Sequence, residues 1–244
     1  MSHTIPDAFS EAFSKEANDA VLEVFFKPKS IAVIGATRDP RGLGGSVLHN
    51  IINAGYKGPL YPINPKADEI AGLKAYPTVV DVPEEVDLAV VTTPARFVPQ
   101  ITEECGRKGC RGMIIISAGF RETGPEGRKT EKEVGEIAKR YGMRVIGPNV
   151  LGVVDTITPH NATFAAVMPK KGVTAFMSQS GALMSAILDW SLGEGFGFSS
   201  MVSLGNKLDV DEIDLLKAWA DDPNTKVILG YLEGITDGQK FIET

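Results

Sequence analysis

A glycine-rich turn near the start of the chain has the residue types and spacing to bind a phosphate group. Residues 30–52 read SIAVIGATRDPRGLGGSVLHNII, which predicts a short apolar strand, a turn and a helix. A helix N-terminus favours an anion because it presents unpaired N–H groups and the positive end of the helix dipole. A purely structural β–α turn is the alternative interpretation. The residues predicted to form this site are Gly35, Ala36, Thr37, Arg38, Gly44 and Gly45.

The end of the second predicted strand indicates which phosphate ligand this turn prefers. Dinucleotide sites use the spacing G-x-G-x-x-G and place an Asp or Glu here to bind the ribose hydroxyls. In this chain the turn is longer and the strand ends in YPINPK, so Asn64, Pro65 and Lys66 replace the acid. A lysine favours an additional phosphate, such as the 3′-phosphate of coenzyme A or the 2′-phosphate of NADP, and the spacing leaves both open. A solvated surface lysine is the structural alternative.

Two further turns at strand ends are small enough to admit a ligand close to the backbone. They read VTTPA and ISAGF, and both follow predicted parallel strands. Open α/β sheets bind their ligands at the carboxyl ends of such strands. The residues predicted to bind from these turns are Thr92, Thr93, Pro94, Ala118 and Gly119.

A second possible anion site lies in the last third of the chain. In FMSQSGALMSAILDW a strand is expected to end at Ser178, and a helix to begin just after Gly181. Ser178, Gln179, Ser180 and the backbone N–H groups there could bind phosphate, or the serines could simply cap the helix. A serine-hydrolase elbow requires G-x-S-x-G, and the serine two positions before Ser180 disfavours that chemistry.

The remaining candidates for metal binding or redox chemistry have structural explanations. Acids follow the next predicted strand in GNKLDVDEIDLL, but acids in the first turn of a helix are expected from the dipole alone, so no metal site is predicted. Cys105 and Cys110 match neither a C-x-x-C pair nor a zinc site, and are expected to be buried or half-buried thiols. The acids concerned are Asp209, Asp211, Glu212 and Asp214.

Alternating short apolar runs and amphipathic runs predict that an α/β fold positions these turns. The strands are continuous apolar runs, which is typical of parallel strands covered on both faces. Strands are predicted at residues 31–34, 60–63, 88–92, 112–116 and 144–146, with helices at 46–54, 97–108 and 126–141. After an irregular stretch, strands follow at 173–178, 199–204 and 226–232, with helices at 182–192 and 212–220. The fold class is therefore a doubly wound α/β domain followed by a second α/β domain that looks incomplete.

Composition argues against several classes of function. With 25 basic and 31 acidic residues the formal charge is −6, which disfavours non-specific binding to nucleic acid. The N-terminus lacks the basic and apolar regions of a signal peptide, and no apolar run is long enough to span a membrane. We therefore expect a cytoplasmic protein without nucleic-acid or membrane partners.

Several stretches together resemble a known ligase family. FKPKSIAVIGAT, GGSVLHNI, YPINPK and GPNVLG resemble the CoA-binding domain of the NDP-forming acyl-CoA synthetases, relatives of the succinyl-CoA synthetase alpha subunit. NATFA, SQSGAL, LGNKLDVDEIDLLKAWADDP and YLEGITDG resemble the next domain of the ADP-forming acetyl-CoA synthetases. The resemblance runs in order from Phe25 to Thr244. It implies a Rossmann-like domain, a flavodoxin-like domain, and coenzyme A rather than NADP as the cofactor.

The resemblance also implies roles for individual residues. Asn149 would join the CoA site, and Gly205, Asn206 and Lys207 would hold an acyl phosphate. Glu233 would support a phosphorylated histidine by accepting a hydrogen bond from its second ring nitrogen. The family places that histidine beyond this motif, so the phosphate carrier is expected to be missing. The histidines of this chain, none of which matches that position, are His3, His49 and His160.

These expectations combine into a domain plan and a function. The plan is an N-terminal extension at 1–24, a CoA-binding domain at 25–147, an inter-domain crossing at 148–172 and a ligase domain at 173–244, truncated before the phosphohistidine segment. The expected function is the CoA-binding component of an NDP-forming acyl-CoA synthetase, inactive alone. It would work with an ATP-grasp domain or subunit in a homo- or hetero-oligomer. A non-catalytic CoA-binding or sensing module and an NADP-dependent oxidoreductase are the alternatives.

Overall fold

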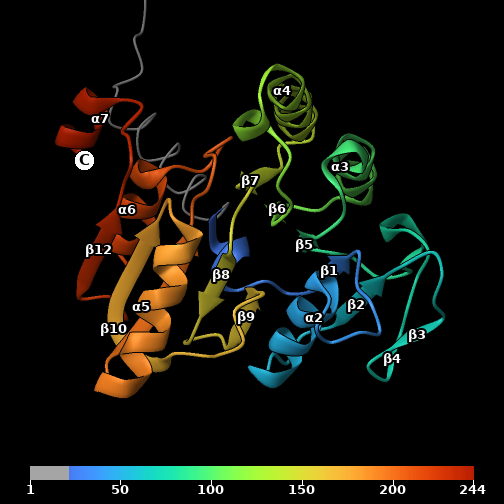
Figure 1. Cartoon of the computed structure of the whole chain (residues 1–244), viewed down its shortest axis with the longest axis horizontal. Helices are drawn as coiled ribbons and strands as arrows, with labels where there is room; N and C mark the ends of the chain where they lie inside the picture. The colour runs from blue at the N-terminus through green and yellow to red at the C-terminus, as the bar shows by residue number, and fades with distance from the viewer. Residues whose placement is uncertain (1–21) are drawn as a thin grey trace, which may run out of the picture.

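The computed structural model describes residues 22–244, which form two α/β domains side by side (Figure 1). Most of the predicted N-terminal extension lies outside the described residues. Residues 22–26 form a short helical turn before Pro28. Leu22, Val24 and Phe25 are buried in this turn, so it packs into the core of the molecule.

The first domain is built on a five-stranded parallel sheet with the strand order β2-β1-β5-β6-β7. Each strand predicted here is confirmed to within one residue. The strands are β1 (Ile31–Ile34), β2 (Leu60–Ile63), β5 (Leu88–Val91), β6 (Gly112–Ile115) and β7 (Arg144–Ile146), and the helices are α2 (Leu43–Asn53), α3 (Val98–Lys108) and α4 (Pro125–Arg140). The connections contain the small hairpin of β3 (Glu69–Ile70) and β4 (Leu73–Lys74), and the 3-10 turns η1 (Val79–Asp81), η2 (Ala95–Phe97) and η3 (Arg121–Thr123).

Successive residues of the central strands pack on opposite faces of this sheet. Val33 of β1 packs in a cluster with α2 and with strands of the second domain. Its neighbour Ala32 belongs to the cluster formed with α3 and α4, which lie side by side (Figure 1). Because both faces are covered, all four residues of β1 are buried, and this explains the continuous apolar runs in the sequence.

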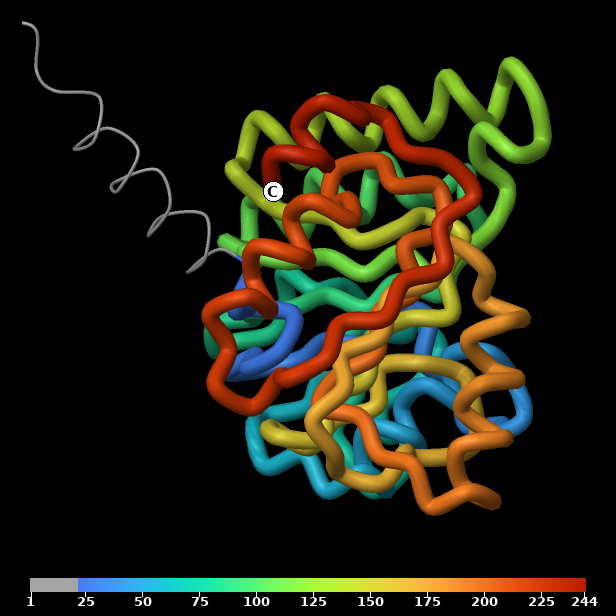
Figure 2. Tube along the Cα trace, turned by 90° about the vertical axis from the view of Figure 1, so that its left-hand side faces the viewer, coloured from blue at the N-terminus to red at the C-terminus, as the bar shows by residue number. Residues whose placement is uncertain are grey.

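The second domain has a mixed five-stranded sheet with the order β12-β10-β11-β8-β9. The strand β12 is parallel to β10 and lies beside it, as Figure 2 shows in red and orange. The strands β10 and β11 are also parallel, whereas β8 and β9 are antiparallel additions. The elements are β8 (Gly152–Asp155), β9 (His160–Thr163), β10 (Lys170–Ser178), α5 (Gly181–Glu194), β11 (Gly197–Ser203), α6 (Glu212–Ala220), β12 (Val227–Tyr231) and α7 (Gly238–Glu243).

The stretch expected to be an irregular crossing contains the hairpin β8–β9, which completes the second sheet. Sequence reasoning missed both strands. The residues of β9, HNAT, do not form an apolar run, although all four are buried, and the short run of β8, GVVD, lies among prolines and polar residues. Contacts across the domain boundary provide hydrogen-bond partners for some of the backbone groups of this polar segment. The Asn50 side chain on α2 donates to the backbone carbonyls of Thr163 and Ala165, both at 2.8 Å. The crossing is therefore also a packing element.

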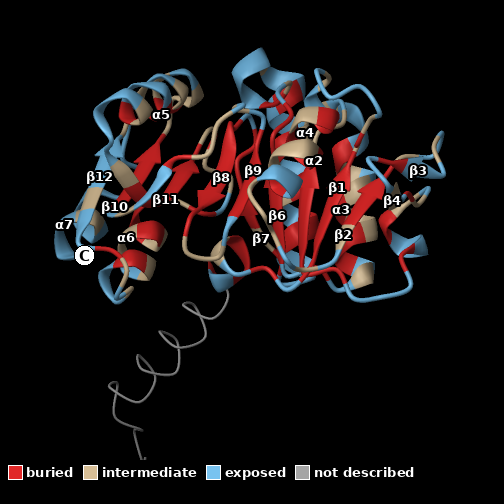
Figure 3. Ribbon diagram, turned by 90° about the horizontal axis from the view of Figure 1, so that it is seen from below, coloured by how far each residue is buried: buried red, intermediate tan, exposed pale blue. Residues whose placement is uncertain are grey.

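Two further features differ from, or extend, the prediction. The helix α2 begins at Leu43, three residues earlier than expected, because Gly44 and Gly45 let its first turn pack directly on the preceding loop. The edge strand β12 is exposed along most of its length (Figure 3), and its exposed residues include the apolar Val227, Leu229 and Tyr231. A partner that covers this edge stays a prediction. Within residues 22–244, no helix has both the length and the apolar character of a membrane span.

Candidate functional site

The strand order of the first sheet reverses between β1 and β5, which is where open α/β sheets bind ligands. The turns after these two strands meet there. The backbone N–H of Thr92 donates to the carbonyl of Ile34 at 2.9 Å, and the Thr92 hydroxyl donates to the same oxygen at 2.9 Å. Gly35, which follows Ile34, therefore lies against Thr92, so two predicted turns form one site.

The glycines of the first turn are required by close backbone contacts. Gly35 has a φ of +92°, and a Cβ there would lie 2.7 Å from the Thr92 hydroxyl oxygen. A Cβ on Gly44 would lie 2.0 Å from the carbonyl oxygen of Gly35, and one on Gly45 would lie 1.9 Å from that of Asp39. The first turn of α2 thus packs on the glycine turn itself, and its N-terminus is directed at the switch point.

The second-strand residues divide into one that shapes the site and two that are exposed. The Asn64 amide donates to the carbonyl of Ala36 at 2.7 Å, and its oxygen accepts from the N–H of Lys66 at 2.8 Å. Asn64 therefore ties the turn after β1 to the turn after β2. Pro65 and Lys66 are exposed beside it. Dinucleotide sites carry a ribose-binding acid at the position of Asn64. In this fold the Asn64 amide has a structural role instead.

Arg38 and Thr37 lie at the outer part of the same turn. Arg38 is exposed, and its Nε donates to the carbonyl of Glu69 at 3.2 Å. The Thr37 hydroxyl donates to the carbonyl of Asp39 at 3.2 Å. Both side chains remain at the surface of the turn. Ala36, which precedes them in the chain, is buried.

The third and fourth turns bring further predicted residues to the switch point. The Thr93 hydroxyl oxygen is buried and has no hydrogen-bond partner among the described residues. The Ser117 hydroxyl donates to the Thr93 carbonyl at 2.5 Å. The backbone carbonyl of Ser117 accepts from the N–H of Asn149 at 3.0 Å. Asn149 has a φ of +62°, a conformation that costs energy for a non-glycine residue and is common at functional sites. Pro94, Ala118 and Asn149 are exposed.

The serines at the start of α5 act as a helix cap. Ser180 is the N-cap residue, and its hydroxyl accepts from the N–H of Leu183 at 3.2 Å. The Ser178 side chain is buried, and its hydroxyl donates to the carbonyl of Ser180 at 2.8 Å. Gly181 begins the helix. The geometry supports the capping interpretation for both side chains and leaves the backbone N–H groups of the first turn as the anion-binding feature.

Gln179 and Lys207 both contact the segment that carries Glu233. The Gln179 side-chain oxygen accepts from the N–H of Glu233 at 2.7 Å and from that of Gly234 at 3.1 Å. The Lys207 ammonium donates to the carbonyl of Gly234 at 2.7 Å and to Glu212 at 2.9 Å. Glu233 itself is exposed. The ends of β10, β11 and β12 thus meet at one place.

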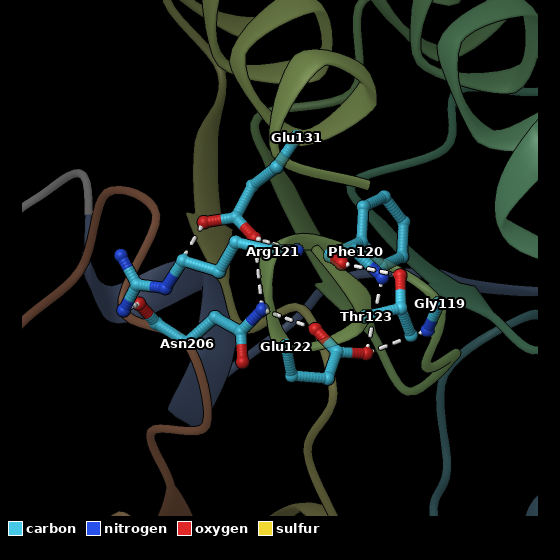
Figure 4. Close-up of polar contacts among 7 residues, drawn as sticks. All are labelled: Gly119, Phe120, Arg121, Glu122, Thr123, Glu131 and Asn206. Atoms are coloured by element: carbon cyan, nitrogen blue, oxygen red, sulfur yellow. Dashed lines mark hydrogen bonds and ion pairs between the residues drawn. The ribbon is translucent and has the colours of Figure 1, made fainter. Parts of the chain in front are cut away.

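Asn206 joins the two domains through a network of carboxylates (Figure 4). Its amide nitrogen lies 2.8 Å from Glu122 and 2.8 Å from Glu131. Arg121 donates to the Asn206 carbonyl and pairs with Glu131 at 3.5 Å. Glu122 also accepts from the N–H of Gly119 at 2.6 Å. Asn206, predicted to hold an acyl phosphate, therefore has its side chain engaged between the domains.

The electrostatics of Glu122 follow from these contacts. Burial raises the pKa of its carboxyl group, but hydrogen bonds from Asn206, Gly119 and Phe120 outweigh burial and leave the pKa below its ordinary value. Glu122 is therefore ionised at neutral pH, and it fixes the turn after β6 to the loop after β11. Arg121, Glu122 and Glu131 were not predicted as site residues. The acids that follow the SAGF turn at residues 121–131 were the signal in the sequence that could have indicated them.

The acids near the start of α6 are all engaged by the protein. Arg144 pairs with Asp209 at 2.8 Å and with Asp214 at 2.7 Å. Asp211 caps α6 by accepting the N–H groups of Ile213 and Asp214, and Glu212 pairs with Lys207. Among residues 22–244, no group of His, Cys, Asp and Glu is arranged to hold a metal ion.

The described histidines and cysteines have structural contacts. His49 lies 2.8 Å from the carbonyl of Gly45 within α2, and His160 is buried between the carbonyls of Thr158 and Phe25. His3 lies outside the described residues. Cys105 and Cys110 are buried free thiols, as predicted.

Comparison with known proteins agrees with this geometry. Residues 29–156 match the model of a CoA binding domain, and residues 171–244 match that of the succinyl-CoA ligase like flavodoxin domain. The chain is 48% identical over 226 residues to the alpha subunit of acetate–CoA ligase (ADP-forming) I of Pyrococcus furiosus, covering 91% of this chain and 49% of that one. It is 48% identical over 218 residues to 4-hydroxybutyrate–CoA ligase (ADP-forming) of Nitrosopumilus maritimus, covering 88% and 31%.

Solved structures give the same result. Acetyl-coenzyme A synthetase 1 of Ca. Korarchaeum cryptofilum superposes with a TM-score of 0.88 at 46% identity, over 91% of this chain and 48% of that one. The fold and the matched family models together define an α/β protein with a CoA-binding domain and a ligase-type flavodoxin domain. The chain belongs to the NDP-forming acetyl-CoA synthetase family, as an alpha-type chain, and the family predicted from its sequence motifs is confirmed. This chain spans about half the length of the Pyrococcus furiosus alpha subunit.

Proposed function

We propose that this chain is the CoA-binding component of an ADP-forming acyl-CoA synthetase. The reaction converts acyl-CoA, phosphate and ADP to the free acid, CoA and ATP. CoA is then a substrate, which corrects its description as a cofactor. The observation that carries the proposal is the site at the β1/β5 switch point, where Gly44 packs on Gly35 beside Thr92 in a chain with a CoA-binding domain.

The residues at the switch point fit coenzyme A by their chemistry. The α2 N-terminus, with Thr37 and Arg38, suits a diphosphate group. Lys66 is exposed beside Asn64, and we assign the 3′-phosphate to its ammonium group. The buried Thr93 hydroxyl is available as a donor or acceptor. Asn149 lies on the side of the second domain, so we place the thioester end toward that domain.

The second domain would support the phosphoryl steps. Phosphate attacks the thioester carbonyl, which forms an acyl phosphate and releases the CoA thiolate. A histidine then accepts the phosphoryl group and releases the acid, and the phosphohistidine transfers it to ADP. On this chain we assign the N-terminus of α5 to phosphate and Glu233 to the support of the phosphohistidine. The histidine and the ADP site would come from another segment or subunit, consistent with the name "subunit alpha" of two relatives.

Calorimetric titration of the purified chain with CoA, dephospho-CoA, NADP and NAD tests the proposal. We expect micromolar affinity for CoA, weaker affinity for dephospho-CoA, and no heat of binding with NAD. Binding of NADP without binding of CoA would refute it and would favour an oxidoreductase. A cytoplasmic location and an oligomer with an ATP-grasp partner remain predictions.

A further inference from the structure

The segment that carries Glu233 has little packing of its own. It follows β12, and every residue from 233 to 240 is exposed. An exposed segment without buried apolar side chains does not hold one backbone conformation unless hydrogen bonds fix it. The direction of the Glu233 carboxylate therefore depends on what holds the backbone at this position.

Two side chains from neighbouring strand ends hold the backbone of Glu233 and Gly234. Gln179, one residue after β10, accepts both N–H groups at one oxygen, at 2.7 Å and 3.1 Å. Lys207, in the loop after β11, donates to the Gly234 carbonyl at 2.7 Å. The backbone N–H of Gln179 also donates to the carbonyl of Tyr231, at 3.0 Å. Three backbone groups of two consecutive residues are thus fixed by two side chains.

Lys207 is itself anchored inside the protein. Its side chain is 6% exposed and pairs with Glu212, which is fully buried. Its φ of +50° is unfavourable for a residue with a side chain, so the fold imposes this backbone conformation at an energetic cost. A lysine in this position offers no exposed charge to a phosphate group.

We propose that Gln179 and Lys207 are positioning residues that fix the backbone of Glu233, and with it the direction of the carboxylate, instead of binding phosphate. The inference rests on the proposed function, in which Glu233 supports a phosphohistidine. It changes the role that the sequence predicted for both residues. In this proposal, residues at the ends of β10 and β11 fix the backbone conformation of the segment after β12.

Amide hydrogen exchange measured by NMR on the ¹⁵N-labelled chain tests this role. In Gln179→Ala the N–H groups of Glu233 and Gly234 should exchange at least tenfold faster. Gln179→Glu should restore slow exchange, because a carboxylate oxygen accepts the same two hydrogen bonds. Gln100→Ala, which removes an exposed glutamine of α3, is the matched control and should leave both amides unchanged.

The lysine arm needs a double variant, because Lys207→Met alone leaves the Glu212 carboxylate buried without its partner. Lys207→Met/Glu212→Leu should raise exchange at the same two amides about threefold, since the Gly234 carbonyl loses its donor.

The outcomes separate the positioning role from its alternatives. Unchanged exchange at Glu233 and Gly234 in Gln179→Ala would overturn the proposal, as would an equal increase throughout β12, which would indicate a general structural role. Weaker binding of inorganic phosphate in Gln179→Ala with unchanged exchange would restore its role as a ligand. CoA titration of the wild-type sample reports on the proposed function separately, because the exchange result does not depend on CoA.

Discussion

The two candidate ligand sites of this chain use their polar side chains in opposite ways. In the first domain, Arg38, Lys66 and Asn149 are exposed around a tightly packed glycine turn. In the second domain, Asn206 and Lys207 are largely buried and bound to protein carboxylates. Buried polar side chains at the strand ends thus hold loops, because internal partners neutralise them, whereas exposed ones are free to serve the ligand contacts that we propose.

The largest effect is expected for Lys207, whose charge lies inside the second domain. Lys207→Met should destabilise the fold by about 3–5 kcal/mol, because the fully buried Glu212 loses its counter-ion. Denaturant unfolding measures this change. Lys132→Met is the control, since its partner Glu136 is exposed and the pair contributes little. Equal small effects in both variants would remove the distinction between the two regions.

Asp155 extends the comparison to pH dependence. It is buried, and burial raises the pKa of its carboxyl group to about 7, even though it accepts hydrogen bonds from Ile157 and Thr158. The folded state therefore keeps a proton that the unfolded chain releases near pH 4. The resulting stabilisation is fully present below about pH 4 and is lost as pH rises through about 7, on the order of 2–4 kcal/mol.

The variant Asp155→Asn separates this contribution from those of other acids. Asparagine keeps an acceptor oxygen for the two N–H groups and has no charge. Unfolding experiments from pH 4 to pH 8 should show a smaller loss of stability in the variant than in wild type. Parallel curves would mean that Asp155 is ionised in the folded chain.

Gly44 tests the packing of the first region. Gly44→Ala should cost about 1–3 kcal/mol, because its Cβ would lie 2.0 Å from the carbonyl of Gly35 and the helix must shift. It should also weaken CoA binding more than tenfold, since the shift moves the α2 N-terminus. Gly193→Ala, where a Cβ meets nothing within 4 Å, should be neutral or slightly stabilising. Thermal unfolding and calorimetry provide both readouts.

Lys66 should give the smallest but most selective effect. Lys66→Ala should weaken CoA binding about tenfold, equivalent to about 1.4 kcal/mol, and leave dephospho-CoA binding within about twofold. Lys57→Ala removes another exposed lysine, at the opposite end of β2, and should change neither affinity. Equal weakening of both ligands in Lys66→Ala would exclude the assignment of the 3′-phosphate to this residue.

The sequence predicted the first domain in detail because its strands are continuous apolar runs and its turns have distinctive residues. Gly35 and Thr92 were expected at the ends of parallel strands, and the switch point brings them together. The strand β9 was missed because buried polar strands have no apolar pattern. The roles of Gln179 and Asn206 were missed for another reason. Their partners lie more than fifty residues away in the chain, so only the tertiary fold reveals the contacts.

CoA binding at the β1/β5 switch point underlies the functional assignments made for this chain. Chemical-shift mapping of the ¹⁵N-labelled chain during CoA addition tests this location. We predict the largest shifts at the amides of Gly35, Thr93 and Gly119, with smaller shifts at the start of α5 and none at Asp155, which lies at the far end of the second sheet. Shifts confined to other surfaces, or none at saturating CoA, would contradict the proposed site.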